Sequence, residues 1–410
     1  MGSEQFTAGI KGAMQMNNFT YYTPTKVVFG KKAEEQVGTL VKEQGCKKVL
    51  VHYGGHSAKK SGLLDRVRAS LEAEGISYVM LGGVVPNPRL SLVRKGIEIC
   101  RQENVDFLLA VGGGSVIDSS KAIGYGAANE GEVWDFYAKI RKPAACLPVG
   151  AVLTIAAAGS EMSNSSVITN DEEKNWMKKG CSSDLGRCRF AVMNPELTMT
   201  LPEYQTQSGC VDIMMHTMER YFNRGENMEL TDGISENLLR TVMKNARILL
   251  DEPDNYNARA EVMWAGSLSH NGLTGCGTDG GDWACHQLEH ELGATYDVTH
   301  GAGLAAVWGT WARYVYKEKP DRFLKFARNV MQVPDAENDE ETILAGIEAM
   351  EAFYRSIHMP VNLKELGISG LTEEEIQDLA YRCTYQETRT IGCIKKLGKK
   401  EIADIYRLAQ

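Results

Sequence analysis

Short apolar segments alternate with amphipathic ones from residue 25 to residue 129, and this alternation limits the possible folds more than any other feature. The apolar segments cover residues 25–30, 47–55, 76–84 and 105–115, and the segments with helical spacing cover residues 31–45, 61–75, 90–104 and 115–129. A strand that is apolar throughout is buried on both faces, and helices between such strands cover those faces. We therefore predict an α/β domain with a parallel sheet and helices on both sides. Further strands are expected within residues 145–169 and 188–197.

The character of the sequence changes near Leu201, after which helical spacing dominates. One helix there begins at Thr372 with a capping pair completed by Glu375, and a final amphipathic helix covers residues 399–409. The chain is expected to divide into a leader or tag at residues 1–15, an α/β domain at residues 16–200 and an all-helical domain at residues 201–410. Because ligands commonly bind between domains, the active cleft is expected at the junction of these two.

Composition and charge narrow the classes of partner. The net charge of −8 and the pI near 5.6 provide no basic face for nucleic acid. No apolar run reaches the roughly 20 residues of a membrane span, and residues 1–15 lack the apolar core of a signal peptide. The ten cysteines are scattered without a Cys-x-x-Cys pair, which is typical of reduced thiols. We expect a cytoplasmic protein that binds small molecules, with no nucleic-acid or membrane partner.

A triple glycine ends the most apolar of these segments. Gly112, Gly113 and Gly114 precede Ser115, where a strand is expected to end and a helix to begin. Unhindered backbone N–H groups at the positive end of a helix suit a phosphate, and here a pyrophosphate. The pattern is neither the G-x-G-x-x-G fingerprint nor a Walker loop, and a tight turn without a ligand would have the same sequence.

A second glycine turn, at Gly54 and Gly55, follows an earlier predicted strand. In dinucleotide-binding domains an acidic residue after an early strand holds the ribose 2′-hydroxyl, and its absence leaves room for a 2′-phosphate. This turn carries no acid, whereas Gly55, Ser57 and Lys60 offer space, a hydroxyl and a positive charge. The pattern favours NADP(H) over NAD(H), although a solvated surface lysine at position 60 is the alternative.

Residues 212–300 contain five of the eight histidines. Asp212 and His216 stand four apart in a segment with helical spacing, so both project from one helix face, and His286 and His290 repeat this spacing. His300 follows after a turn-like run. Up to four of these side chains can converge on one ion, and a carboxylate with imidazoles suits Fe(II) or Zn(II) better than Mg²⁺ or Ca²⁺. Histidines that cap helices or fill a core are the alternative.

Together these motifs resemble the iron-containing (group III) alcohol dehydrogenase family, and within it the NADPH-dependent butanol dehydrogenase-like aldehyde reductases. The resemblance extends from about Met16 to the C-terminus. It rests on NNFTYYTPTKVVFG, YGGHSAKKSG, GGGSVIDSSKAIG, AGSEMSNSSVIT, GCVDIMMHTMERYF and HQLEHELGATYDVTHGAGLA. It implies a dinucleotide-binding α/β domain, a helical metal-binding domain and a homodimer. His56 departs from the triple glycine expected of the subgroup, so a bulkier side chain stands next to the expected 2′-phosphate site.

The resemblance also implies roles for single residues. Metal coordination is implied for Asp212, His216, His286 and His300. Cofactor binding is implied for Gly113, Gly114, Ser115 and Asp118, in the pyrophosphate and nicotinamide-ribose region, and for Thr154, Ser163 and Lys178, along the cofactor groove. His290 matches a histidine near the nicotinamide that is not a ligand. We expect it to relay a proton, and orienting a metal ligand or a ribose hydroxyl is its alternative role.

The predicted function is hydride transfer between NADP(H) and a small primary alcohol or aldehyde such as butanol or butanal, with the metal as Lewis acid. A metal- and nicotinamide-dependent lyase like dehydroquinate synthase is the alternative enzyme. It would need a cluster of Arg and Lys around the metal, whereas the segments that flank the ligands here are mostly apolar or acidic. A non-catalytic protein with a defunct nucleotide fold is a third hypothesis, which intact ligands and two glycine turns disfavour.

Overall fold

The structure is a computed structural model that describes residues 16–55, 57–172 and 176–410. The predicted leader at residues 1–15 and the departure at His56 lie outside these ranges. Six parallel strands form the central sheet, in the order β1-β8-β5-β4-β2-β3. They are β1 (Lys26–Phe29), β2 (Lys48–Tyr53), β3 (Ser77–Leu81), β4 (Phe107–Gly112), β5 (Val149–Leu153) and β8 (Phe190–Met193). The parallel sheet predicted from the alternating pattern is confirmed.

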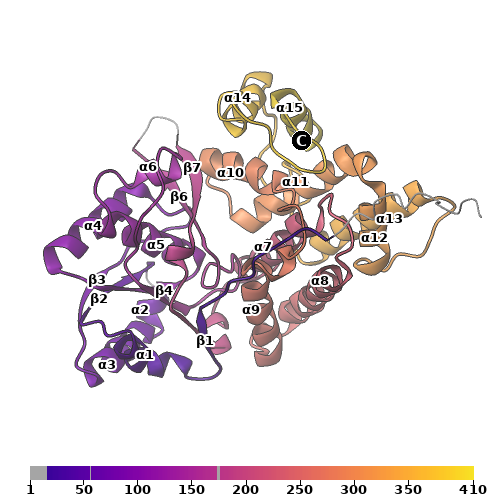
Figure 1. Ribbon diagram of the computed structural model, residues 1–410. Helices are drawn as coiled ribbons and strands as arrows, with labels where there is room; N and C mark the ends of the chain where they lie inside the picture. The colour runs from indigo at the N-terminus through magenta and orange to yellow at the C-terminus, as the bar shows by residue number, and fades with distance from the viewer. Residues whose placement is uncertain (1–15, 56, 173–175) are drawn as a thin grey trace, which may run out of the picture.

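Helices cover both faces of this sheet (Figure 1). They are α1 (Val37–Glu43), α2 (Ser57–Lys60), α3 (Leu63–Ala73), α4 (Leu90–Glu103), α5 (Gly114–Ala128) and α6 (Trp134–Tyr137). The helix expected over residues 31–45 begins later than predicted. Lys32 adopts a left-handed φ of 59°, and a 3-10 turn (Ala33–Gln36) comes before α1. A left-handed residue cannot continue a right-handed helix, so α1 starts only after it.

The central strand β4 explains how the apolar pattern produces this sheet. All six of its residues are buried. Phe107, Leu109 and Val111 belong to a core shared with α1 and α3, whereas Leu108 and Ala110 belong to a core shared with α4 and α5. Successive side chains of a strand point to opposite faces, so a strand between two helical layers requires an unbroken apolar run.

A two-stranded antiparallel hairpin, β6 (Ser165–Asn170) and β7 (Met177–Ser182), stands apart from the main sheet. A strand at β6 was predicted within residues 145–169, but β7 was not predicted. Its sequence MKKGCS is polar and mostly half-buried, so no apolar alternation marks it. The hairpin packs against α5 through β6 and against α10 through β7, and it therefore links the two domains (Figure 1).

The described residues from Glu203 onward form helices, short 3-10 turns and one isolated bridge between Ile391 and Leu397. The helices are α7 (Glu203–Tyr221), α8 (Glu229–Asp251), α9 (Tyr256–His270), α10 (Ala284–Tyr296), α11 (His300–Val315), α12 (Pro320–Asn329), α13 (Asp339–Ser356), α14 (Glu373–Cys383) and α15 (Lys399–Leu408). The capping pair of Thr372 and Glu375 is present at the start of α14. The helical C-terminal domain is confirmed, and it forms the second lobe in Figure 1.

Within the ranges that the structure describes, no helix combines the length and the apolar character needed to cross a membrane. All ten cysteines lie in those ranges as free thiols, as their scattered positions predicted.

His52 is buried in β2 and is expected to make folding sensitive to acid. Its ring nitrogens lie 2.8 Å from the Leu81 carbonyl oxygen and 2.8 Å from Ser119 Oγ. Burial lowers the pKa of His52 to about 4, below the value near 6.5 of an unfolded chain. Between these two pH values the unfolded chain alone takes up this proton. The stability contribution is therefore complete above about pH 6.5 and is lost as the pH falls toward 4, by on the order of 3 kcal/mol.

Urea unfolding of wild type and His52→Gln between pH 7 and pH 5 measures this effect. The wild type should lose more unfolding free energy with falling pH than His52→Gln, whose side chain does not titrate. The exposed His358, changed to Gln, serves as the control and should leave the wild-type slope intact. Equal slopes for wild type and His52→Gln would contradict the assignment.

Candidate metal centre and cofactor groove

A cavity of about 700 Å³ lies between the sheet domain and the helical domain. Its wall includes the start of α5 and β7 from one side and α7, α10 and α11 from the other, together with loop residues within positions 86–88 and 155–164. Among the predicted site residues, the wall includes Gly114, Ser115, Asp118, Ser163, Lys178, Asp212, His216, His286, His290 and His300. The cavity thus brings the triple-glycine turn and the histidine-rich helices to one common space.

Asp212 and His216 lie one turn apart on α7, as their spacing predicted. His216 Nδ1 is 3.1 Å from Asp212 Oδ1 and 3.0 Å from the Asp212 carbonyl oxygen. The helix approaches the sheet domain closely because Gly209 has no side chain. A Cβ there would lie 2.3 Å from the Ala156 carbonyl oxygen.

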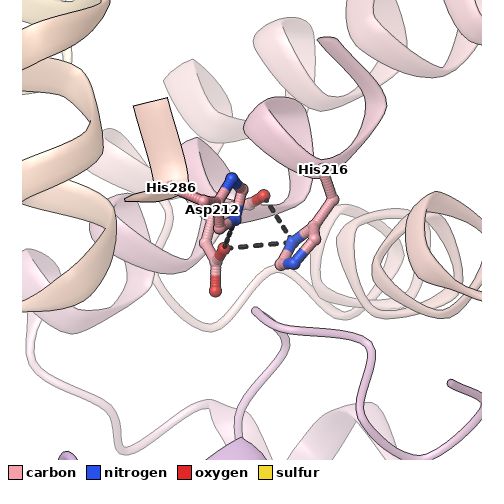
Figure 2. Close-up of side chains that lie close together, drawn as sticks. All are labelled: Asp212, His216 and His286. Carbon is pink, nitrogen blue, oxygen red and sulfur yellow. Dashed lines mark hydrogen bonds and ion pairs between the residues drawn. The ribbon is translucent and has the colours of Figure 1, made fainter. Parts of the chain in front are cut away.

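His286 comes from the first turn of α10 and points toward Asp212 and His216 (Figure 2). Its backbone N–H and its ring Nδ1 contact Glu219 Oε1 at 2.9 Å and 3.0 Å. Nδ1–H therefore donates to this carboxylate, and Nε2 keeps its lone pair. Nε2 lies 3.9 Å from Asp212 Oδ1.

His300, the first residue of α11, completes the cluster. Its Nε2 is 3.7 Å from Asp212 Oδ1, and its Nδ1 contacts Glu289 Oε2. Lys178 of β7 approaches the same carboxylate, with Nζ 3.2 Å from Glu289 Oε2 and 3.4 Å from His300 Nδ1. Three imidazoles therefore surround one carboxylate oxygen. Two of them also contact a buried glutamate through Nδ1: His286 contacts Glu219, and His300 contacts Glu289.

Burial and neighbouring groups set the charges in this cluster. Burial lowers the pKa of His216 to about 4, so its imidazole is neutral at pH 7. Burial raises the pKa of Asp212, but the imidazoles of His216 and His300 outweigh burial and hold that pKa below its ordinary value. Burial likewise raises the pKa of Glu289, and His300 and Lys178 bring it below its ordinary value. Ionised carboxylates and neutral imidazoles are the forms that bind metal.

The cluster fits a divalent cation. The ligand atoms of Asp212, His216 and His286 all lie within 4.8 Å of one another. Asp212 Oδ1 and His286 Nε2 are buried without a hydrogen-bond partner among the described residues. A buried polar atom without a partner costs free energy, and a cation between these two would pair both. A carboxylate with imidazoles is a ligand set for a first-row transition metal such as iron.

His290 lies one turn further along α10, apart from this cluster. Its ring centroid is 6.5 Å from that of His286 and 6.0 Å from that of His300. Burial lowers the pKa of His290 well below its ordinary value, and the charge of Lys178 lowers it further. A neutral imidazole therefore faces the cavity at this position at pH 7. The four-residue spacing alone could not separate His290 from the ligand candidates.

Three neighbours of the cluster were not predicted from the sequence. Glu219 stands seven positions after Asp212 on the same helix face, and this spacing could have identified it. Glu289 stands three positions after His286, and this spacing also places it on the same helix face, but not next to His300 or Lys178. His270, at the end of α9, has its ring centroid 4.0 Å from that of His216, and its buried Nδ1 has no partner in the part of the chain that is described. Only the tertiary contact of α9 with α7 reveals it.

The turn from β4 to α5 forms as predicted. A Cβ at Gly113 would lie 2.0 Å from Ile155 Cγ2, so the turn requires glycine there. Residues 114–115 begin α5 on the cavity wall. Asp118 accepts a hydrogen bond from the Val167 N–H at 2.9 Å through Oδ2, whereas its buried Oδ1 finds no partner within the described ranges. That oxygen is available to a ligand in the cavity.

Several predicted cofactor residues lie at the same sheet edge but outside the cavity wall. The Thr154 N–H donates to the Gly112 carbonyl oxygen at 3.1 Å, so Thr154 flanks the glycine turn. Residues 54–55 follow β2, a direct neighbour of β4 in the sheet. Ser57 and Lys60 are the first and last residues of α2. These positions lie outside the cavity wall, near the carboxyl ends of the strands, where α/β sheets bind ligands.

Ser163 and Lys178 lie on the cavity wall, and both are engaged within the protein. Ser163 Oγ accepts from Lys121 Nζ at 3.4 Å and from the Ser165 N–H at 3.2 Å. Lys178 was predicted along the cofactor groove. From this position on the cavity wall its ammonium group also reaches the histidine cluster, where it pairs with Glu289.

The cationic side chains of the described wall do not form a cluster for a polyanionic substrate, which the alternative lyase would require. Lys139 Nζ donates to the Gly180 carbonyl oxygen at 2.5 Å. Arg220 donates to the carbonyl oxygens of His216 and Ser269, at 2.7 Å and 3.1 Å. Arg389 is bound in the same way, to Gln287 Oε1 at 2.6 Å.

Two family profiles together cover most of the chain. Residues 24–195 match the profile of the iron-containing alcohol dehydrogenase, and residues 206–410 match that of the C-terminal part of the Fe-containing alcohol dehydrogenase family.

Similar proteins align over nearly their whole length. NADH-dependent butanol dehydrogenase A of Clostridium acetobutylicum is 39% identical over 96% of this chain and 99% of its own. NADPH-dependent aldehyde reductase YqhD of Escherichia coli is 35% identical over 87% and 90%. The crystal structure of NADH-dependent butanol dehydrogenase A from Thermotoga maritima superposes with a TM-score of 0.92, at 39% identity, covering 97% of this chain and 99% of that one. The chain therefore belongs to the iron-containing (group III) alcohol dehydrogenase family.

Proposed function

We propose that this alcohol dehydrogenase and aldehyde reductase transfers a hydride between NADP(H) and a small primary alcohol or aldehyde. Butanol and butanal are the proposed type of substrate, because relatives that align over 96–97% of the chain are butanol dehydrogenases. One observation carries the proposal. Three imidazoles meet Asp212 Oδ1 in a cavity whose wall also contains the glycine turn at the start of α5.

Asp212, His216, His286 and His300 are the proposed ligands of Fe(II) or Zn(II). When bound, the ion supplies Lewis-acid polarisation of the carbonyl and the nicotinamide supplies the hydride. The protein's own part is to fix the geometry. Glu219 holds His286 so that Nε2 faces Asp212, and the carboxylate of Asp212 offsets part of the charge of the ion.

His290 is proposed to relay the proton that the alcohol oxygen gains when an aldehyde is reduced. Because burial keeps its imidazole neutral, one ring nitrogen can donate a proton while the other accepts one from water. Orienting a metal ligand or a ribose hydroxyl of the cofactor is the alternative role of this side chain.

The proposed preference for NADP(H) rests on the turn after β2, since similar proteins include NADH-dependent and NADPH-dependent enzymes. Gly55, Ser57 and Lys60 place no carboxylate where the 2′-phosphate would lie. No described atom lies within 4 Å of a Cβ built on Gly55, so a larger residue fits there.

Gly55→Asp is expected to shift the ratio of kcat/KM from NADPH toward NADH. The new carboxylate repels the 2′-phosphate and accepts hydrogen bonds from the ribose hydroxyls of NADH. A difference of about 1.4 kcal/mol changes the ratio about tenfold. Gly55→Asn has the same shape without the charge and should shift the ratio less. A wild type that already prefers NADH would contradict the interpretation of this turn.

Three further features remain proposals. The domain limits are 16–200 and 201–410, supported by the end of the last sheet strand at Met193 and the start of α7 at Glu203. Homodimer formation follows from the family resemblance, and light scattering of the purified protein tests it. A cytoplasmic location is supported by ten free cysteines.

A screen of small aldehydes with NADPH and NADH, after reconstitution with Fe(II) or Zn(II), tests the proposed function. Consumption of NADPH with butanal is the expected result. Release of phosphate from a sugar-acid phosphate, with no aldehyde consuming either cofactor, would support the lyase instead.

A further inference from the structure

Glu289 is a buried carboxylate whose role goes beyond the proposed ligand set. It lies on α10 between His286 and His290 and has no exposed surface (0%). Its Oε2 contacts His300 Nδ1 and lies 3.2 Å from Lys178 Nζ. Its Oε1 is also buried and finds no hydrogen-bond partner among the residues described.

Two glycines make the space for this side chain. A Cβ on Gly293 of α10 would lie 2.8 Å from Glu289 Oε1, and a Cβ on Gly303 of α11 would lie 2.8 Å from Glu289 Cγ. Both contacts are shorter than real Cβ atoms adopt. The two helices therefore leave room for a carboxylate directly behind His300. Burying an ion costs several kcal/mol, so such a group persists only where charged or hydrogen-bonding partners compensate it.

The compensation comes from both domains. His300 belongs to α11 of the helical domain, and Lys178 belongs to β7 of the hairpin that packs on α10. The side chain of Lys178 is only 6% exposed, so this ion pair is poorly screened by solvent. One carboxylate thus binds a side chain of the proposed metal centre and a side chain of the proposed cofactor groove.

The contact with His300 repeats an arrangement seen at His286. There Glu219 binds Nδ1 and leaves Nε2 at 3.9 Å from Asp212 Oδ1. At His300 a carboxylate again binds Nδ1, and Nε2 lies 3.7 Å from the same oxygen. A carboxylate behind an imidazole fixes its tautomer and ring orientation and makes the other nitrogen a better ligand.

We infer that Glu289 is a positioning residue that holds the His300 imidazole toward the metal and holds Lys178 at the cofactor groove, so that one buried carboxylate supports the binding of both. The inference rests on the proposed function, in which His300 is a metal ligand and Lys178 lines the groove.

Glu289→Gln tests whether Glu289 holds the His300 imidazole toward the metal, because glutamine keeps the shape and removes the charge. We expect the metal-free, full-length variant to bind Zn(II) about 10–100-fold more weakly than wild type, which is the usual effect of losing an outer partner of a ligand. Competition with a chromophoric chelator measures the affinity without turnover. The visible spectrum of bound Co(II) should also change, since the orientation of one ligand is lost.

Lys178→Met separates the effect of Glu289 on metal binding from its effect on cofactor binding. It removes the positive charge but leaves Glu289 behind His300, so Zn(II) affinity should stay at the wild-type level or rise, while NADPH binding to the metal-free protein weakens. Glu289→Gln should weaken NADPH binding too, and the double variant should lose no more than Lys178→Met alone, because both changes act through one ion pair. Fluorescence titration with NADPH measures this.

Glu291→Gln is the matched control. Glu291 lies on the same helix, where burial raises its pKa to about 7, and it pairs with Arg382 at 3.3 Å away from the cluster. It should leave both affinities at the wild-type level. Wild-type affinities for Zn(II) and NADPH in Glu289→Gln would overturn the inference, as would equal metal losses in Glu289→Gln and Lys178→Met.

His300→Ala distinguishes failure of this inference from failure of the proposed function. If His300→Ala binds Zn(II) weakly and Glu289→Gln binds it normally, the ligand set stands and the role of Glu289 falls. If His300→Ala binds Zn(II) as wild type does, the ligand set itself is wrong, and the inference falls with it.

Discussion

Replacing His286 with alanine is expected to remove both the bound metal and the turnover. The change deletes the Nε2 that faces Asp212 Oδ1 at 3.9 Å and leaves Glu219 without its imidazole partner. Loss of the Lewis acid should lower kcat/KM at least about a hundredfold, which corresponds to about 2.7 kcal/mol of transition-state stabilisation. Metal content of the purified protein and nicotinamide consumption with butanal measure the two losses.

Cofactor binding should survive this substitution, because the turn at Gly113 and the start of α5 lie in the other domain. NADPH fluorescence titration checks that the α/β domain is intact. His358→Ala changes an exposed histidine of the same helical domain and should keep the wild-type metal content and activity. Full activity with stoichiometric metal in His286→Ala would exclude His286 as a ligand.

Substitutions at Asp212 should separate charge from shape. Asp212 is the single carboxylate among the four proposed ligands. Asp212→Asn keeps the shape but should weaken binding of Fe(II) or Zn(II) by at least about 100-fold, since even outer partners of ligands contribute about 10–100-fold. An ion that stays bound would be less neutralised and would therefore be a stronger Lewis acid. Part of the activity should therefore return at saturating metal in Asp212→Asn, but not in Asp212→Ala.

Titration of Fe(II) and Zn(II) into the metal-free forms of wild type and both variants follows metal binding and NADPH oxidation together. Equal metal affinity in all three proteins would show that Asp212 does not bind the ion. The proposal that Asp212 and His216 of α7 bind the same ion would then be wrong.

The alternation of apolar and amphipathic segments predicted the sheet because a strand buried on both faces, such as β4, is apolar throughout its length. The strand β7 has no such apolar run. Its residues are half-buried in a two-stranded hairpin, and lysine and glycine there are compatible with a loop. The start of α1 was also misplaced, because Lys32 is left-handed and a 3-10 turn follows it, so the helix begins later than the apolar spacing suggests.

The site residues were predictable where their spacing places them on one face of a single helix. Asp212 and His216 share a face of α7, and the same argument would have added Glu219. The contacts of Glu289 with His300 and Lys178 join α10, α11 and β7, and no spacing within one element encodes such contacts. The position of Lys178 therefore became clear only from the packing of the hairpin on α10.

We propose that the cluster around Asp212 holds the ion on which hydride transfer depends. The most direct measurement is butanal reduction by chelator-stripped, full-length enzyme as Fe(II) or Zn(II) is added back, with bound metal determined in the same samples. We expect negligible NADPH consumption without metal and a rise that saturates at one ion per chain. Stripped enzyme that contains no metal yet reduces butanal at the full rate would contradict the claim.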